Sequence, residues 1–325
     1  MFKSRFSKAV LFVLGLFIVI TALVGLQTPR DFPVDTVVTI EKNTGLTHTA
    51  QMLMEKHVIG SAFLYKVAVV LMGGHKNIMA GDYVFDAPQP LFTVARRTIK
   101  GNYGLTTYKV TIPEGSTSKD IGWIILKEIP DFNAPAFLSL AKPLEGYLFP
   151  DTYLFYSNVK PQEVVKMLTD TFDEKISTLK TSIGVFVQAS SKATSSRVTS
   201  EQVLTMASIV EREAMNAEDR KIISGILWKR YKAGMALQVD APFHYLYNKP
   251  SSELTLDDLK IDSPYNTYVY KGLPPGPISN PGLETIQDTI APKETKYWYY
   301  LSDKDGKMHY AEDLEGHVKN KQKYL

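Results

Sequence analysis

The stretch Thr199-Ser-Glu-Gln-Val-Leu-Thr-Met-Ala-Ser-Ile-Val-Glu-Arg-Glu213 predicts the helix around which the rest of the chain is organised. Thr199 is placed to cap its N-terminus, and Gln202 stands three positions later, from where its side chain can reach back to the cap. Apolar residues recur at helical spacing along the stretch, which predicts a stripe that faces a core. The residues of this stripe are Val203, Met206, Ile209 and Val210.

Glu211 lies at the edge of this stripe, one turn after Ala207 and Ser208. These small neighbours are expected to leave open space around a carboxyl group that is held partly against apolar surface. Desolvation of this kind raises the pKa of a carboxyl group, so that it keeps its proton near neutral pH as a general acid must. The alternative is that Glu211 lies with Arg212 and Glu213 on a solvated helix face and has no chemical role.

The composition sets the class of protein. The 325 residues are enough chain for two domains with a sizeable core. The formal net charge is +3 and the basic residues are scattered, so nothing points to a nucleic acid as partner. No cysteine is present, which excludes a disulfide framework, a thiolate metal site and a cysteine nucleophile.

Common catalytic motifs give no competing function. The six histidines form no tight ligand pair, so we expect no metal and no cofactor. Ser116-Thr-Ser-Lys119 matches the Ser-x-x-Lys of penicillin-binding enzymes, but no Lys-Thr-Gly partner follows it. Ser116 and Thr117 are better explained as helix caps.

Residues 9–26 form an 18-residue run without a charge, preceded by Lys3, Arg5 and Lys8. At about 1.5 Å per residue, a helix of this length spans roughly 27 Å, close to the hydrocarbon thickness of a bilayer. The basic flank predicts that residues 1–8 form a cytoplasmic tail. Because no clear small-x-small cleavage site follows, the run favours an uncleaved transmembrane anchor over a signal peptide. Residues 27–33 then predict a short juxtamembrane linker, with the rest of the chain outside the membrane.

Two segments predict a strand followed by a helix. Val37-Val-Thr-Ile40 precedes helical spacing over 45–56, and Val110-Thr-Ile112 precedes helical spacing over 116–127. The pair indicates an internal repeat or, alternatively, a plain α+β domain whose halves share only their capping residues. Between the two, residues 81–85 predict a strand and residues 92–98 a helix.

The second half of the chain predicts further helices and a cleft wall. Helices are expected over 161–179, between Asn216 and Gly234, and around His317, with a hairpin turn at Asp305-Gly306. Residues 190–200, rich in Ser and Thr, predict a mobile loop. The Pro- and Gly-rich residues 272–282 predict a rigid, irregular backbone of the kind that lines a cleft.

Leu144-Glu-Gly-Tyr-Leu-Phe-Pro-Asp-Thr-Tyr153 is rich in aromatic residues and carries the acids Glu145 and Asp151. Such a run could line a sugar site, because aromatic faces stack on pyranose rings and carboxylates accept hydrogen bonds from sugar hydroxyls. The alternative is a buried loop or strand that packs its aromatic rings into the core.

Five stretches together resemble the endolytic murein transglycosylases of the YceG-like (MltG) family. The resemblance covers nearly the whole chain after the anchor, and it is specific because five modest motifs occur in the right order. The stretches are Glu145-Gly-Tyr-Leu-Phe-Pro-Asp-Thr-Tyr153, Ala207-Ser-Ile-Val-Glu-Arg-Glu213, Leu237-Gln-Val-Asp240, Ser263-Pro-Tyr-Asn-Thr-Tyr268 and Gly272-Leu-Pro-Pro-Gly-Pro-Ile-Ser-Asn-Pro-Gly282.

The resemblance implies an α+β fold in three parts. These are a single transmembrane helix, a LysM-like peptidoglycan-binding subdomain over 27–108, and a mixed α/β transglycosylase domain over 109–325. Members of the family are single-pass proteins of the bacterial inner membrane, with the N-terminus in the cytoplasm and the catalytic domain outside. They cut nascent glycan strands within the chain. The expected partners are therefore peptidoglycan strands, the membrane and the cell-wall synthesis machinery.

The family's catalytic glutamate falls on Glu211, which implies a lytic mechanism. Protonated Glu211 would donate to the glycosidic oxygen between N-acetylmuramic acid and N-acetylglucosamine. The C6 hydroxyl of the same muramic acid attacks the oxocarbenium-like centre, Glu211 accepts its proton, and a 1,6-anhydro end results. No second carboxylate is needed, unlike in ordinary glycosidases. The candidates for sugar binding are Glu145, Gln238, Asp240, Tyr265, Asn266, Tyr268 and Asn280.

Two other functions stay open at this point. The first is a two-carboxylate glycoside hydrolase, with Glu213, Asp240 or Glu145 as the second acid. The second is a membrane-tethered peptidoglycan-binding scaffold without catalysis. One stretch, Ala241-Pro-Phe-His244, departs from the family pattern, so sugar contacts there are expected to differ.

Overall fold

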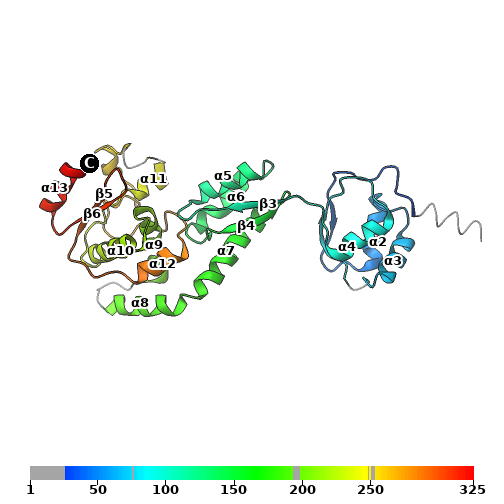
Figure 1. The fold of residues 1–325 in the computed structure, drawn as a ribbon, viewed down its shortest axis with the longest axis horizontal. Helices are drawn as coiled ribbons and strands as arrows, with labels where there is room; N and C mark the ends of the chain where they lie inside the picture. The colour runs from blue at the N-terminus through cyan, green and yellow to red at the C-terminus, as the bar shows by residue number, and fades with distance from the viewer. Residues whose placement is uncertain (1–25, 75–76, 193–197, 248, 250–252) are drawn as a thin grey trace, which may run out of the picture. The chain divides into compact units, whose positions relative to one another are not determined.

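The computed structural model describes residues 26–74, 77–192, 198–247, 249 and 253–325. The chain divides after Thr106 into two compact units. Helices and small antiparallel two-stranded sheets make it an α+β protein, as predicted (Figure 1). The predicted anchor lies outside the described residues except for Leu26. Within the described ranges, no helix has the length and apolar character needed to cross a membrane.

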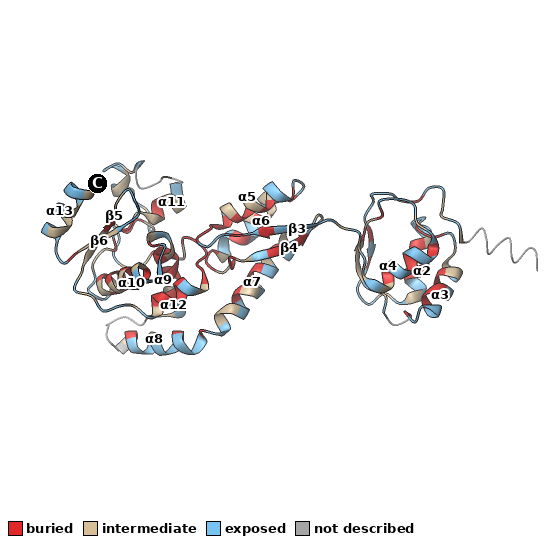
Figure 2. Ribbon diagram, viewed as in Figure 1, coloured by how far each residue is buried: buried red, intermediate tan, exposed pale blue. Residues whose placement is uncertain are grey.

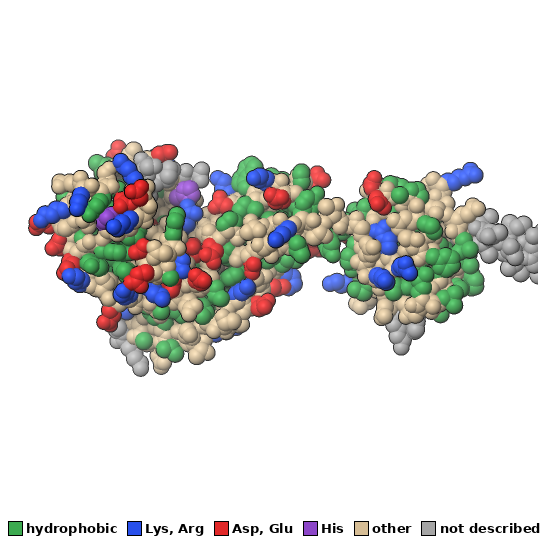
Figure 3. Space-filling view, viewed as in Figure 1, with side chains coloured by type: hydrophobic (Ala, Val, Ile, Leu, Met, Phe, Trp, Pro, Cys, Tyr) green, Lys and Arg blue, Asp and Glu red, His purple; other side chains and the backbone are tan. Residues whose placement is uncertain are grey.

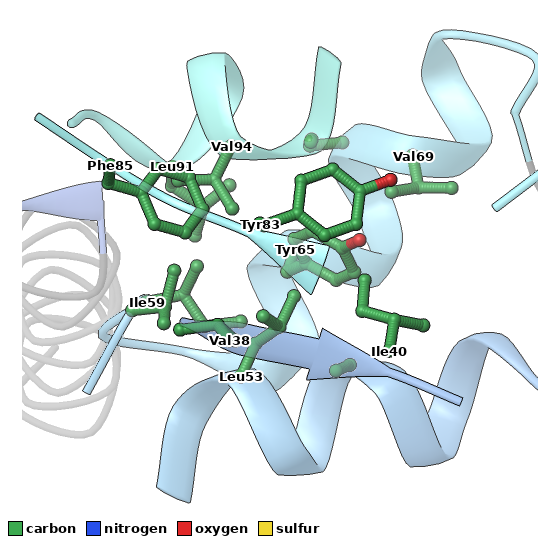
Figure 4. Packing of buried hydrophobic residues seen from close by; sticks show 14 of the residues in the cluster. Val38, Ile40, Leu53, Ile59, Tyr65, Val69, Tyr83, Phe85, Leu91 and Val94 are labelled. Atoms are coloured by element: carbon green, nitrogen blue, oxygen red, sulfur yellow. The ribbon is translucent and has the colours of Figure 1, made fainter. Parts of the chain in front are cut away.

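The described residues of the first unit form one antiparallel strand pair and three helices. Its elements in chain order are β1 (Val38–Ile40), α2 (Leu46–Glu55), α3 (Ala62–Leu71), β2 (Gly81–Tyr83) and α4 (Leu91–Lys100). The predicted strands and the helices α2 and α4 are confirmed, and α3 was not predicted. Figure 4 shows the core of this unit, in which side chains from both strands meet those of the helices.

The predicted linker over 27–33 is part of this first unit. Phe32 is buried and meets the ring of Phe85 edge to face, with 5.4 Å between ring centroids. The hydroxyl of Thr28 donates to the carbonyl oxygen of Gln89 at 3.1 Å. The linker prediction was therefore wrong, because an aromatic side chain within these residues completes the core.

The second unit begins with a strand pair covered by helices. Its first elements are β3 (Thr107–Thr111), α5 (Ser118–Glu128), α6 (Ala134–Ala141), the 3₁₀ turn η1 (Lys142–Leu144), β4 (Thr152–Tyr156) and α7 (Pro161–Ser177). Strand β3 pairs antiparallel with β4. Thr117 caps α5 in a reciprocal capping box with Asp120, which confirms its predicted structural role. Phe149 and Tyr153 are buried, as expected if the aromatic run packs into the core.

The rest of the second unit surrounds one buried helix, α9 (Ser200–Glu213). The other elements are α8 (Lys180–Lys192), α10 (Ala217–Lys232), α11 (Ala241–Tyr247), η3 (Asp258–Lys260), α12 (Leu283–Ile290), β5 (Tyr299–Ser302), β6 (Met308–Ala311) and α13 (Leu314–Tyr324). Helix α9 packs against α8, α10, α11 and α12, and all of its residues from 203 to 210 are buried (Figure 2). The predicted capping box of Thr199 and Gln202 and the predicted hairpin of β5 and β6 are confirmed.

The mobile loop predicted over 190–200 is wrong at its start. Residues 190–192 continue α8, where Ser190 is buried. The hydroxyl oxygen of Ser191 accepts a hydrogen bond from the N–H of Val198 at 3.0 Å. Helix α8 therefore continues into the Ser-rich segment as far as Lys192. Residues 193–197 lie outside the described residues.

Candidate active site

Glu211 stands in the last turn of α9, at the end where the helix leaves the core. Its carboxylate oxygen Oε2 accepts a hydrogen bond from the N–H of Gly282 at 2.9 Å. The turn at Gly115 lies against its stem: a Cβ added at Gly115 would be 3.4 Å from the Cγ of Glu211. Gly115 has a φ of +74°, a left-handed conformation that favours glycine. Two loops distant in sequence therefore fix the glutamate from two sides, and its side chain is half-buried.

The open space expected beside Ala207 and Ser208 is absent from this structure. Both residues are fully buried. The hydroxyl oxygen of Ser208 accepts from the N–H of Ile278 at 3.0 Å, and the hydroxyl of Ser279 donates to the carbonyl oxygen of Ser208 at 3.0 Å. The small residues serve a different purpose from the one predicted. They let the Pro- and Gly-rich segment lie directly on α9 and carry Gly282 to Glu211.

A second carboxyl group, that of Glu114, lies beside Glu211. A Cβ added at Gly282 would be 1.8 Å from Oε1 of Glu114, so this carboxyl rests directly on the Gly282 backbone. Although its side chain reaches solvent, burial of the carboxyl and then the nearby charges of Glu211 and Glu284 raise the pKa of Glu114. Sequence reasoning missed Glu114. Glu114 follows a predicted strand in the turn Pro113-Glu-Gly115, and it stands 97 positions before Glu211 in the sequence.

Glu145 and Asn280 form a buried network behind this site. The amide Nδ2 of Asn280 donates to Oε1 of Glu145 at 2.8 Å and to the carbonyl oxygen of Ser116 at 2.9 Å. Its Oδ1 accepts from the N–H groups of Gly146 and Leu148 at 2.8 and 2.9 Å. These contacts join the turn before α5, the loop after η1 and the loop that carries Gly282.

The carboxyl group of Glu145 is held by Ser118, whose N–H donates at 3.0 Å and whose hydroxyl donates at 2.7 Å. Burial raises the pKa of Glu145 to about 7 in spite of these hydrogen bonds. Glu145 is 6% exposed and Asn280 fully buried. In this structure both side chains are engaged inside the protein, which makes them scaffolding groups of the site. Their assignment as direct sugar contacts stays a prediction.

Two further loops predicted to bind sugar lie against each other. The N–H of Gln238 donates to the carbonyl oxygen of Thr267 at 3.0 Å. The hydroxyl of Tyr268 donates to Oδ1 of Asp240 at 2.6 Å. Gln238 is exposed with a φ of +52°, so its side chain is free to meet a ligand. Asn266 is buried, and its Nδ2 donates to the carbonyl oxygens of residues 259 and 261.

Glu213 is turned away from Glu211, because side chains two positions apart on a helix do not share a face. Its carboxylate accepts a hydrogen bond from the hydroxyl of Tyr300 at 2.9 Å. Burial raises the pKa of Glu213 to about 7, and the charge of Asp240 adds to the shift. Of the three second acids considered for a hydrolase, Glu145 and Glu213 are thus held in contacts of their own, and Asp240 is bonded to a tyrosine.

An open groove lies between α6 with η1 and the segment that carries α11. It is lined by Pro135, Leu138, Ser139, Lys142, Pro143, Tyr245 and Tyr265. The rings of Tyr245 and Tyr265 are 5.6 Å apart between centroids. Tyr265 was predicted as a sugar contact, whereas Tyr245 was missed. Two neighbouring aromatic rings beside a lysine and a serine suit a sugar ring.

Arg212, which follows Glu211 in α9, and His244, which precedes Tyr245 in α11, lie near each other between Glu211 and this groove. Arg212 donates from Nη1 to the carbonyl oxygen of Gly115 at 3.2 Å. Burial, together with the charge of Arg212, lowers the pKa of His244, and Asp120 opposes this shift. His244 lies in the stretch that departs from the family pattern, and it precedes Tyr245 on α11. The part of the chain that the structure describes holds no cluster of three His, Cys, Asp or Glu side chains arranged for a metal ion.

Comparison with known proteins places the chain in a family. The model of the YceG-like family matches residues 38–323. An endolytic murein transglycosylase of Bacillus subtilis (strain 168) is 28% identical over 315 residues, covering 89% of this chain and 84% of the relative. One of Streptococcus pneumoniae (strain ATCC BAA-255 / R6) is 34% identical over 183 residues. That match covers 54% of this chain but only 31% of the relative.

A solved structure agrees with the family match. The 2.6 Å crystal structure of a putative YceG-like protein from Listeria monocytogenes has a TM-score of 0.58 and 28% identity to this chain. The likeness covers 87% of this chain and 98% of the Listeria chain. Since the family model spans the described strands and helices from β1 to α13, the chain belongs to the YceG-like family.

Proposed function

We propose that the protein is an endolytic peptidoglycan transglycosylase in which Glu211 acts first as acid and then as base. The observation that carries the proposal is the placement of Glu211. It stands at the half-buried end of a helix whose residues 203–210 are all buried, with one oxygen held by the N–H of Gly282. A fixed carboxyl group is what proton transfer requires, because donor and acceptor must lie within hydrogen-bond reach in the reacting geometry.

The reaction needs one carboxyl group used twice. Protonated Glu211 donates to the oxygen that leaves as the bond between N-acetylmuramic acid and N-acetylglucosamine breaks. The C6 hydroxyl of the muramic acid then attacks the anomeric carbon, and its proton passes to the Glu211 carboxylate. The products are a strand that ends in 1,6-anhydro-muramic acid and a strand with a free N-acetylglucosamine end. The acid is regenerated in the same cycle.

A path for the glycan strand follows from the charged and aromatic side chains near Glu211. It runs from Glu211 past Arg212 and His244 to the rings of Tyr245 and Tyr265. The proposed sugar contacts on this path are the exposed Gln238 and the two tyrosines, while Asp240 and Tyr268 shape the loop between them. Asn266, Glu145 and Asn280 are proposed to hold the loops in place from behind.

The cellular setting is also part of the proposal. The apolar run over 9–26 supports a single-pass anchor in the cytoplasmic membrane, with both described units outside the cell's interior. The first unit, which has a core of its own, is proposed as the LysM-like peptidoglycan-binding subdomain. Peptidoglycan strands and the cell-wall synthesis machinery are the proposed partners of the whole protein.

A second candidate function is favoured by Glu114. Its carboxyl group lies on the backbone of Gly282, whose N–H holds Glu211, so the site contains two neighbouring carboxyl groups. Glycoside hydrolases use such a pair, with one group as acid and the other as base or nucleophile. Glu114 therefore replaces Glu213, Asp240 and Glu145 as the second acid of a hydrolase.

Product analysis tests the proposal and separates the two functions. The full chain is incubated with uncrosslinked glycan strands, and the released fragments are analysed by mass spectrometry. We expect internal fragments with 1,6-anhydro ends from the wild type and from Glu114→Gln. Reducing ends that carry an added water, lost in Glu114→Gln, would identify the hydrolase instead.

Glu211→Gln is the decisive variant. The amide keeps the shape of the side chain but cannot donate the proton, so we expect turnover to fall at least about 10²-fold with normal folding. Glu201→Gln is the matched control, because Glu201 lies exposed in the first turn of the same helix. Full activity of Glu211→Gln would contradict the assignment.

A further inference from the structure

Helix α3 has two apolar faces, and only one of them is used by the core. Tyr65, Ala68 and Val69 are buried in the first unit. On the other face Phe63 is 68% exposed and Leu71 is 78% exposed. Large apolar side chains gathered on one exposed face mark a contact surface in proteins.

The exposed side chains form one continuous face. Positions 63, 67, 70 and 71 follow helical spacing, so their side chains lie along the same side of α3. We call these four residues the α3 apolar face; they are Phe63, Val67, Val70 and Leu71, all exposed.

The start of the described chain fixes this unit to the predicted anchor without a free linker. Leu26 is the last residue of the 18-residue apolar run, and its side chain packs against the core of the first unit. Phe32 is buried in the same core. A unit that holds the end of a membrane-spanning segment in this way must lie at the membrane surface.

Helix α3 lies on the side of the first unit where the described chain begins (Figure 1). Figure 3 shows hydrophobic side chains gathered on that side. The helix carries a single charge, that of Lys66, and no acidic residue, so α3 itself brings no carboxylate toward anionic lipid headgroups.

We propose that the α3 apolar face docks on the lipid surface of the membrane that holds the anchor. The side chains of Phe63 and Leu71 enter the boundary between headgroups and acyl chains, as the apolar faces of interfacial helices do. The contact fixes the first unit against the bilayer. The inference rests on the membrane anchor proposed above and is independent of the catalytic mechanism.

The absence of cysteines makes a direct test possible. Single cysteines are introduced in the full chain at Leu71 (Leu71→Cys) and, as control, at the exposed Glu55 of α2 (Glu55→Cys). Each is labelled with an environment-sensitive fluorophore. The protein is reconstituted into phosphatidylethanolamine–phosphatidylglycerol vesicles whose acyl chains carry a nitroxide quencher. We expect quenching at position 71 to exceed that at position 55 several-fold.

A double serine variant and a vesicle flotation assay show how each outcome bears on the proposal. Phe63→Ser with Val70→Ser should reduce quenching at position 71 to the control level without lowering the melting temperature. Equal quenching at positions 71 and 55 in protein that floats with the vesicles would overturn the docking alone. Failure to float would overturn the anchor and the docking together. Self-quenching that rises with the protein-to-lipid ratio, without quenching by lipid, would assign the face to a second copy and overturn the proposal.

Discussion

Asn280→Ala tests whether the buried network behind the site holds the second unit together. The substitution removes four hydrogen bonds of 2.8–2.9 Å. Two acceptors keep a partner: the carbonyl oxygen of Ser116 still receives the N–H of residue 280, and Glu145 still receives the N–H of Ser118. The N–H groups of Gly146 and Leu148 lose their only side-chain acceptor.

The expected loss in the free energy of unfolding follows from these two N–H groups, which are left without a hydrogen-bond acceptor. An unsatisfied buried hydrogen-bonding group costs about 1–3 kcal/mol, so two cost about 2–6 kcal/mol. A folded domain is stable by only about 5–15 kcal/mol, which makes this a large share of the total. We therefore expect a marked fall in the free energy of unfolding of the second unit.

Urea denaturation followed by tryptophan fluorescence measures the loss, because Trp228 is buried in the same unit. Asn133→Ala is the matched control: its side chain accepts one hydrogen bond, from the N–H of Ala136 at the start of α6, and is exposed. Removal of such a cap costs about 1 kcal/mol. A loss for Asn280→Ala no larger than for Asn133→Ala would refute the reasoning.

Three other substitutions have defined outcomes. The pKa of Glu145 is raised from 4.5 to about 7, so the folded chain keeps a proton that the unfolded chain releases. The stabilisation that protonated Glu145 gives the folded chain is therefore complete below about pH 4.5. It is lost as the pH rises from there to about 7, and stability does not change further with this group above that pH. Glu145→Gln should reduce this pH dependence, measured as the difference in urea midpoint between pH 5 and pH 8. Asp288→Ala should lower the free energy of unfolding by about 3–5 kcal/mol, because it leaves the guanidinium of Arg220, 2.7 Å away and equally buried, without its main partner. Gly282→Ala should change both the urea midpoint and the turnover little, because its φ of −71° suits alanine and the new methyl group displaces only the carboxyl end of Glu114, which the proposed transglycosylase does not use. A large loss of turnover would favour the hydrolase.

Elements whose signals are local could be predicted from the sequence. The spacing of Thr199 and Gln202 predicts the start of α9, and the structure contains both hydrogen bonds of that capping box. The hairpin turn at Asp305-Gly306 and the cap at Asn216 are local signals of the same kind. In each case the residues that decide the structure lie within a few positions of one another.

The walls of the site could not be predicted in this way. Glu114 and Gly282 meet Glu211 across 97 and 71 residues of sequence. Their contact depends on how the loops pack, and a single sequence contains no periodic pattern that reports it. The same holds for the link between Glu145 and Asn280, which motif matching identified as two separate sugar contacts.

Helix α3 was missed for a different physical reason. Periodicity detects a helix when one face is apolar and the other polar. The sequence Ala-Phe-Leu-Tyr-Lys-Val-Ala-Val-Val-Leu over residues 62–71 is apolar on both faces, so it has no such period. The feature that hid the helix from sequence analysis is the same feature that gives it a second contact surface.

Glu211 lies where two parts of the second unit, each with its own core, meet. The turn at Gly115 belongs to the part of the second unit whose core is formed around β3, β4 and α5, whereas α9 belongs to a separate core with α10. Backbone hydrogen bonds between residue 280 and residues 115 and 116 join the two parts at this point. A glycan strand that binds along the proposed path would contact both parts. Glu114 stands on one part and Glu211 on the other, so the geometry of this pair depends on how the two parts are joined here. The turn from the opposing half forms a second wall beside Glu211, so the alignment of the two halves is part of the geometry of the proposed active site.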